Sequence, residues 1–443
     1  MKQTPKKPQR SSMVRDTLST FGTNAFGSVM GLIASLAVLT RLDPFDKGIY
    51  NQVQTWGEGF FTCLGFSLNS AIIYYVARYT IKNTSKAIKK LTVGVGIFLV
   101  AVSSVVLFLL NGTSTFFKET PSPYLICIVI YTACSFLFNV MTGILRGENK
   151  FKSYNMINLL QRILVTVFAV LTLWFPSAAL LVGSAIGISA AAVVLAYICT
   201  KRWNGPQPQA AEIDDHPVPA KPMFQYGLKA YASNLMTYIN SYIGNYIVQG
   251  VYGVAEFGIY NAAFTIMRQV WILPEAVSLV ITSRVASMHD DGDKRRITQL
   301  SCKIVMYITI ICAILIVLVA QFFVPIIFPK YVKAIDPLRY LIIGSVFISY
   351  VKVLANSISA YGRPELNILP TVLGIVANIV ATILLIPSMG INGIALATSV
   401  SMVVQAVAVL IIYCKFTHTN VLWLIVPTKA ETTLVTKALR RGK

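Results

Sequence analysis

The chain has 443 residues, of which 55% are hydrophobic and 12% are charged, and its mean hydropathy is +0.66. A soluble domain carries roughly 25% charged residues, so the composition excludes an ordinary soluble protein. The net charge of +21 would suggest a nucleic-acid partner in a soluble chain, but here the basic residues gather in alternate loops between apolar segments. That pattern indicates membrane topology, and we predict no nucleic-acid binding.

Many segments are apolar enough to cross about 30 Å of hydrocarbon as helices. In chain order, we predict helices at 17–40, 50–77, 91–110, 123–145, 154–175, 178–200, 224–250, 257–283, 303–324, 338–360, 366–386 and 391–414. The predicted fold class is therefore an all-α polytopic membrane protein with twelve transmembrane helices.

Basic residues are concentrated before the first predicted helix and in every second loop after it. The intervening loops hold only Arg41, Lys47, Lys118, Lys330 and Lys333. By the positive-inside rule both termini are expected to be cytosolic, which agrees with an even number of helices. Contact of the basic loops with anionic membrane lipids is a secondary expectation.

A short internal repeat organises the chain. Gly48-Ile49-Tyr50-Asn51 recurs as Gly258-Ile259-Tyr260-Asn261, with 210 residues between equivalent positions, so we predict one six-helix unit used twice. Because each unit has an even number of helices, a pseudo-two-fold axis along the membrane normal should relate the two lobes. The predicted parts are a basic N-terminus (1–16), an N-lobe (17–202), a proline-rich cytosolic linker (203–222), a C-lobe (223–414) and a basic tail (415–443).

Polar side chains follow single faces of three predicted helices, at three- and four-residue spacing. The candidate lining residues are Asn51, Thr55, Asn234, Tyr238, Asn245, Asn261 and Thr265. Polar groups that face hydrocarbon are costly, so these faces should lie in the bundle interior, either around a wet cavity or as polar contacts between packed helices. The nearly apolar helices 91–110, 178–200, 303–324 and 391–414 are expected to face lipid.

Charged residues inside predicted helices are the strongest functional candidates. The repeat offset places Glu58 opposite Arg268 in the equivalent lobe, and Arg162, Lys352 and Glu275 are also intramembrane. This cationic surplus suits an anionic ligand such as phosphate, although fixed salt bridges are the alternative. Glu58 and Glu275 are candidates for gating or ion coupling. No catalytic motif, metal-ligand spacing or nucleotide-binding loop is found, so we predict no enzyme, cofactor or metal site.

Three stretches resemble the polysaccharide biosynthesis (Wzx-type) oligosaccharide flippases, a family in the superfamily that also holds multidrug and toxin extrusion transporters. They are Arg41-Leu42-Asp43-Pro44-Phe45-Asp46-Lys47-Gly48-Ile49-Tyr50, Phe328-Pro329-Lys330-Tyr331-Val332-Lys333-Ala334, and Asn378 with Ile386-Pro387 and Gly390-Ile391-Asn392-Gly393-Ile394-Ala395. In the second, Pro329 stands where the family usually has glycine.

The resemblance implies a flippase that moves undecaprenyl-pyrophosphate-linked oligosaccharide from the inner to the outer leaflet of a bacterial cytoplasmic membrane by alternating access. Arg268, Lys352 and Arg162 would then hold the pyrophosphate. A polysaccharide polymerase and glycosyltransferases are the expected protein partners. The alternative is a multidrug or cation antiporter of the same fold, for which an acidic cavity would be expected.

Overall fold

The computed structural model describes residues 10–113, 116–202, 218–272 and 290–425, together with a few positions between 274 and 288. Most of the predicted linker (203–217), the first part of the basic N-terminus (1–9) and most of the basic tail (426–443) lie outside the described residues. Every regular element in the described part is a helix, as the composition predicts.

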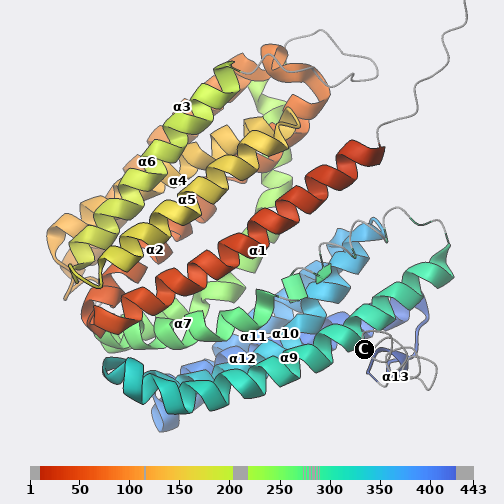
Figure 1. Ribbon diagram of the computed structural model, residues 1–443. Coiled ribbons are helices and arrows are strands. Elements are labelled where there is room, and N and C mark those ends of the chain that lie inside the picture. The colour runs from red at the N-terminus through yellow and green to blue at the C-terminus, as the bar shows by residue number, and fades with distance from the viewer. Residues whose placement is uncertain are drawn as a thin grey trace, which may run out of the picture. The chain divides into compact units, whose positions relative to one another are not determined.

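The helices follow the predicted segments closely (Figure 1). The first six are α1 (Arg10–Arg41), α2 (Pro44–Leu64), α3 (Leu68–Thr113), α4 (Ser122–Gly147), α5 (Phe151–Leu171) and α6 (Ala178–Arg202). They are followed by α7 (Ala220–Arg268), η1 (Gln269–Trp271), α9 (Asp291–Ile327), η2 (Pro329–Ala334), α10 (Ile335–Ala360), η3 (Pro364–Asn367), α11 (Ile368–Met389), α12 (Ile391–Thr417) and α13 (Leu422–Ile425).

Eight of the described helices are long and apolar enough to cross a membrane, or nine if a bent pair counts as one span. The protein is therefore a multi-pass membrane protein, although fewer segments pass this test than the twelve we predict. The long helix α7 does not pass it, because its stripe of Asn, Gln and Tyr side chains lowers its mean hydropathy. Its polar face is the same feature that marks it as an interior helix.

The predicted helix 50–77 is broken in the structure. The break falls at 65–67, where α2 ends, Phe66 and Ser67 have positive φ angles, and the segment Leu68–Tyr79 leaves at 57° to α2. The chain then folds back within α3, because the Phe66 and Phe98 rings lie only 5.8 Å apart. A straight helix would separate positions 68 and 98 by about 45 Å. The two arms of α3 therefore correspond to the end of predicted helix 50–77 and to predicted helix 91–110.

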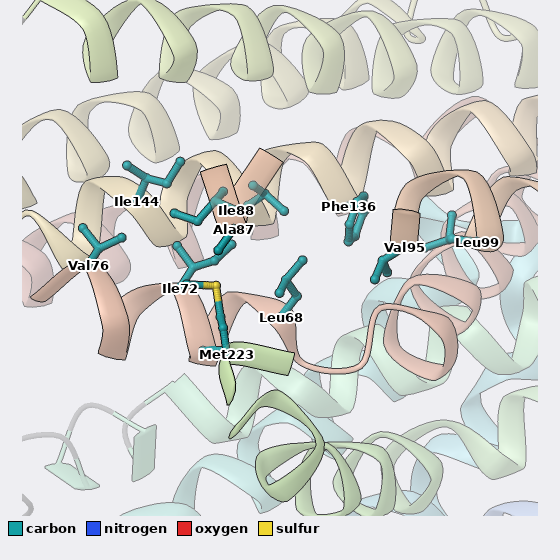
Figure 2. Packing of buried hydrophobic residues seen from close by; sticks show 12 residues of the cluster. Leu68, Ile72, Val76, Ala87, Ile88, Val95, Leu99, Phe136, Ile144 and Met223 are labelled. Carbon is teal, nitrogen blue, oxygen red and sulfur yellow. The ribbon is translucent and has the colours of Figure 1, made fainter. Parts of the chain in front are cut away.

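A cluster of buried apolar side chains holds this fold together (Figure 2). Ile72 from the first arm of α3 lies with Ile88 from the second arm and Ile144 from α4. Met223, from the start of α7, is fully buried in the same cluster. A backbone hydrogen bond from Val218 N to the Asn83 carbonyl, 3.1 Å long, fixes the chain just before α7. The start of α7 thus packs with helices of the N-terminal half.

The chain divides into two compact units, and α7 contributes to both. Unit 1 contains the chain up to Tyr238 and the short segment Gly253–Gly258, while unit 2 contains Ile239–Tyr252 and everything from Ile259 onward. Gly253 interrupts α7 with a φ of 83°, which divides this element into two helices. These two correspond to the predicted helices 224–250 and 257–283.

The glycines that begin the two copies of Gly-Ile-Tyr-Asn, Gly48 and Gly258, meet in unit 1. A Cβ atom on Gly258 would lie 3.1 Å from the Gly48 nitrogen and would collide with the Pro44 carbonyl oxygen. A Cβ atom on Gly48 would collide with the Val254 carbonyl oxygen. Since Pro44 and Val254 are also 210 positions apart, each copy makes the same contact with the other. The repeated glycine is therefore needed for a reciprocal close approach of two backbones.

One lipid-facing assignment is wrong. Segment 391–414 corresponds to α12, which packs against both α10 and α11 and is one of the more buried spans of unit 2. Its buried side chains include Ser399, Ser401 and Gln405, and Gly344 of α10 lies against the backbone of Ser399. Small residues permit such close packing. A high mean hydropathy indicates that a segment lies in the membrane, but it does not show whether lipid or protein surrounds the helix.

We expect Gly48→Ala and Gly258→Ala each to lower stability by about 1–3 kcal/mol, because the added methyl group must push two backbones apart. Gly187→Ala in α6 is the matched control, since a Cβ atom there meets nothing within 4 Å. Thermal unfolding of the purified protein in detergent measures all three. Equal unfolding temperatures for Gly48→Ala and Gly187→Ala would contradict the reciprocal contact.

Candidate functional site

In unit 1, two side chains of α7 hydrogen-bond to the region of the α2 break. The Tyr231 hydroxyl donates to the Cys63 carbonyl at 2.7 Å, and the Asn234 amide donates to the Ser67 hydroxyl at 2.9 Å. The broken helix leaves carbonyls near its end without their usual i+4 amide donor, and Tyr231 supplies one. This role of Tyr231 has no sequence signal, because the break is not visible in the hydropathy pattern.

Two more of the predicted lining residues meet in unit 1. The Tyr238 hydroxyl donates to the Thr55 carbonyl at 2.8 Å, while Thr55 itself is 5% exposed. Asn51, one turn earlier on the same face of α2, is 8% exposed, and its amide nitrogen is buried without a hydrogen-bond partner in the described part of the chain. Glu58 is half-buried on α2. The structure thus joins Tyr238 to the polar face of α2 and places Asn234 at the break that follows that helix.

Arg162 projects from α5 onto α1. Its Cδ and Nε atoms lie where a Cβ atom on Gly27 would be, so the absence of a side chain at Gly27 makes room for the arginine. Most of the Arg162 side chain remains exposed, while Thr166, one turn later, donates both to the Arg162 carbonyl at 2.8 Å and to the Met30 carbonyl of α1 at 3.1 Å. The sequence analysis did not anticipate that Gly27 positions Arg162.

In unit 2, Lys352 and Glu275 form an ion pair. The Lys352 Nζ lies 2.8 Å from Glu275 Oε1, and the two side chains are 25% and 54% exposed. The same ammonium lies 4.8 Å from the centre of the Trp271 ring, which is a cation–π distance. Lys352 is about two turns before the end of α10 at Ala360, so the pair lies well inside that span.

The local chain path explains how Trp271 and Glu275 reach one lysine. They are four residues apart, which places them on one face wherever the chain is helical. At Gln269–Trp271 the α-helix becomes a 3-10 helix. Pro274 lacks the amide that would bond to the carbonyl four residues earlier, so a change of hydrogen bonding is expected here. The Gln269 side-chain amide donates to the Thr265 carbonyl at 3.0 Å.

Arg268 lies directly before this turn, at the end of α7, and its side chain is exposed. Thr265, one turn earlier, donates to the Asn261 carbonyl at 2.7 Å, with the Asn261 side-chain oxygen 3.3 Å away. Asn245 is 1% exposed, and its amide nitrogen has no hydrogen-bond partner in the described residues. Glu58 belongs to unit 1 and Arg268 to unit 2, so their matched depth stays a prediction.

Two polar contacts outside the predicted site are structural. Asn240 of α7 donates to the Gln405 side chain at 3.0 Å and accepts from Ser401 at 3.2 Å, which joins α7 to α12. Glu119 accepts a hydrogen bond from Val254 N at 3.2 Å, directly after the left-handed Gly253. A carboxylate at the start of a helix is electrostatically favourable, so Glu119 caps the second helix of α7. The sequence did not indicate these roles of Asn240 and Glu119, because neither residue is part of a predicted polar stripe.

Among the described residues, no group of three or more His, Cys, Asp or Glu side chains could hold a metal ion. Contacts in unit 2 join Lys352 with Glu275 and Trp271, and Arg268 precedes Trp271 by three residues in the chain. We call these four residues the unit 2 site. Arg and Lys side chains can bind phosphate or carboxylate by charge and hydrogen bonds.

Solved structures with the same fold are multidrug transporters. An inward-facing structure of a multidrug resistance MATE family transporter of the MOP superfamily has a TM-score of 0.63 at 14% identity, covering 88% of this chain and 94% of that one. An outward-facing structure has a TM-score of 0.65 at 14% identity, covering 93% and 99%. The protein is therefore an all-helical membrane protein of the MATE-like fold.

A sequence profile described as "Polysaccharide biosynthesis protein" matches residues 13–273. The chain belongs to the polysaccharide biosynthesis protein family. It is 24% identical over 405 residues to an uncharacterized membrane protein of the archaeon Methanocaldococcus jannaschii, covering 83% of this chain and 78% of that protein. A second uncharacterized membrane protein of that organism is 26% identical over 164 residues, covering 36% and 38%.

We expect Tyr231→Phe to lower stability by about 0.5–1.5 kcal/mol, because it removes the donor to the Cys63 carbonyl but keeps the ring. Tyr226→Phe is the matched control, since the ring stacking of Tyr226 on Tyr74, at 4.4 Å, survives the change. Thermal unfolding in detergent is again the measurement. If the control destabilises as much as Tyr231→Phe, the hydrogen bond is not what holds α7 to the break.

Proposed function

We propose that the protein is a flippase for lipid-linked oligosaccharide, moving undecaprenyl-pyrophosphate-linked repeat units from the inner to the outer leaflet for surface polysaccharide assembly. The observation that carries this proposal is the cationic surplus of the unit 2 site, where Arg268 and Lys352 accompany one carboxylate, Glu275. Charged side chains inside a membrane are energetically costly, so those that are present are functional candidates. A pyrophosphate headgroup is the ligand that such a surplus suits best within this family.

In this mechanism Arg268 and Lys352 hold the pyrophosphate, and Arg162 provides a further cation. The amide and hydroxyl groups of Asn51, Thr55, Asn234, Tyr238, Asn245, Asn261 and Thr265 contact the sugars, while the lipid tail stays in the bilayer. The support for Arg162 is its exposed side chain, which Gly27 holds in place. Glu58 and Glu275 take the gating or ion-coupling role.

The finer architecture is part of the same proposal. Twelve transmembrane helices form two six-helix lobes around a pseudo-two-fold axis, with both termini cytosolic, and the lobes alternate access to a central cationic cavity. The reciprocal contact of Gly48 and Gly258 supports that axis. The transporter would act in the cytoplasmic membrane beside glycosyltransferases and a polysaccharide polymerase, as the implied supplier and consumer of its substrate.

The second candidate is a multidrug or cation antiporter of the same fold. The solved structures of similar fold favour it, since they are multidrug transporters. The charges of the unit 2 site disfavour it, because a cationic drug would meet Arg268 and Lys352. The two candidates differ in substrate charge, so a transport assay separates them.

We expect Arg268→Ala and Lys352→Ala each to reduce export of lipid-linked oligosaccharide about tenfold or more, because each removes a charged donor to phosphate. Export is measured as surface glycan in cells that carry only the variant, and as flipping in proteoliposomes with purified protein. Size-exclusion elution and thermal unfolding establish that the variants fold.

The matched control is Arg339→Ala. Arg339 forms an exposed ion pair with Asp336 at 3.2 Å in the first turn of α10, and its loss should leave export unchanged. Wild-type export by Arg268→Ala and Lys352→Ala would remove the headgroup role. Drug resistance conferred by the wild-type protein, without glycan export, would favour the antiporter.

A further inference from the structure

The indole N–H of Trp271 is a buried polar group of the unit 2 site without a hydrogen-bond partner among the described residues. Trp271 is 9% exposed, and its Nε1–H makes no hydrogen bond in the described part of the chain. Buried polar groups are almost always hydrogen-bonded, so an exception requires an explanation. The ring packs edge-on against Phe264, with 6.2 Å between centroids, so apolar contacts account for its position but not for its N–H.

The neighbouring ion pair is unequally buried. Lys352 is 25% exposed and is held over the Trp271 ring, whereas Glu275 is 54% exposed. The ammonium would therefore keep one favourable contact if the carboxylate left, and the carboxylate has open space into which it can move. An ion pair with one exposed partner contributes about 1 kcal/mol or less. An incoming anion of higher charge can thus displace Glu275 from Lys352.

We propose, building on the flippase function, that Glu275 is a displaceable counter-ion and Trp271 a ligand-binding residue. The phosphate of the substrate replaces the Glu275 carboxylate on Lys352 and accepts a hydrogen bond from the Trp271 indole. Phosphate suits both donors, because its oxygens accept from an ammonium and from an N–H at once. Glu275 holds the lysine in place while the site is empty and is released when the headgroup binds.

A purely structural ion pair makes the opposite prediction. If Glu275 serves only to neutralise Lys352, its loss leaves a half-buried cation and weakens the fold, with no gain in ligand affinity. If Glu275 competes with the ligand, its loss removes a competitor and the ligand binds more tightly. The sign of the change in affinity therefore distinguishes the two roles.

The experiment measures binding of farnesyl pyrophosphate, a short polyprenyl pyrophosphate, to the full-length protein purified in detergent. Glu275→Gln should tighten binding roughly fivefold, the equivalent of one exposed ion pair. Trp271→Phe, which keeps a ring beneath the lysine but removes the N–H, should weaken binding roughly fivefold to tenfold. The matched controls are Glu365→Gln, from the exposed pair with Arg363, and Trp174→Phe, at a 67% exposed tryptophan.

Competing ligands identify the source of the phosphate. Inorganic pyrophosphate should compete weakly, since it offers the headgroup without the lipid, and phosphatidylglycerol should not compete. Effective competition by phosphatidylglycerol would assign the site to ordinary membrane lipid and overturn the proposal. Unchanged or weaker binding by Glu275→Gln would overturn it as well, and so would wild-type affinity in Trp271→Phe.

The outcomes separate this inference from the proposed function. If the wild type binds farnesyl pyrophosphate and Arg268→Ala loses it, while Glu275→Gln and Trp271→Phe bind like the wild type, the flippase function stands and the counter-ion role is wrong. If the wild type binds no polyprenyl pyrophosphate, both are wrong. Should Trp271→Phe fail to fold, the sign of the Glu275→Gln effect still decides the question.

Discussion

The structure depends on the need to satisfy backbone hydrogen bonds wherever a helix is interrupted, because a buried backbone group that has neither a protein partner nor water is costly. Three interruptions are each matched by a side chain. Tyr231 donates to a carbonyl at the α2 break, Glu119 accepts from the amide that follows Gly253, and Gln269 donates to a carbonyl before the 3-10 turn. Each of these polar side chains is therefore needed at its position because a helix is interrupted there.

The same constraint places the candidate ligand site. The 3-10 turn precedes Pro274 and carries Trp271 to the lysine of α10, with Glu275 one turn further along. In unit 2 the 3-10 turn thus follows Arg268 directly and ends at Trp271, which lies with Glu275 beside Lys352. Irregular backbone at a site of this kind is typical of transporters.

Much of the helical order was predictable, because apolar length and loop charge are properties of local sequence. The break at 65–67 was not, since it interrupts an apolar run and requires positive φ at Phe66 and Ser67, which no residue preference announces. The ion pair of Lys352 with Glu275 joins two residues that the sequence analysis selected separately. The role of Trp271 was not predicted, because a hydropathy pattern does not show whether an indole N–H has a hydrogen-bond partner. The burial of α12 depends on the helices that pack against it, and the composition of a single segment does not predict those neighbours.

The membership of α7 in both compact units bears on how such a chain could have arisen from a duplicated half. A fragment ending with α6 would lack Met223 in the Ile72 cluster and the Tyr231 hydroxyl at the Cys63 carbonyl. It would also lack the second glycine of the reciprocal contact. A half-length ancestor would therefore have needed a second copy to complete its core. Fusion of the two genes would have made that dimer permanent.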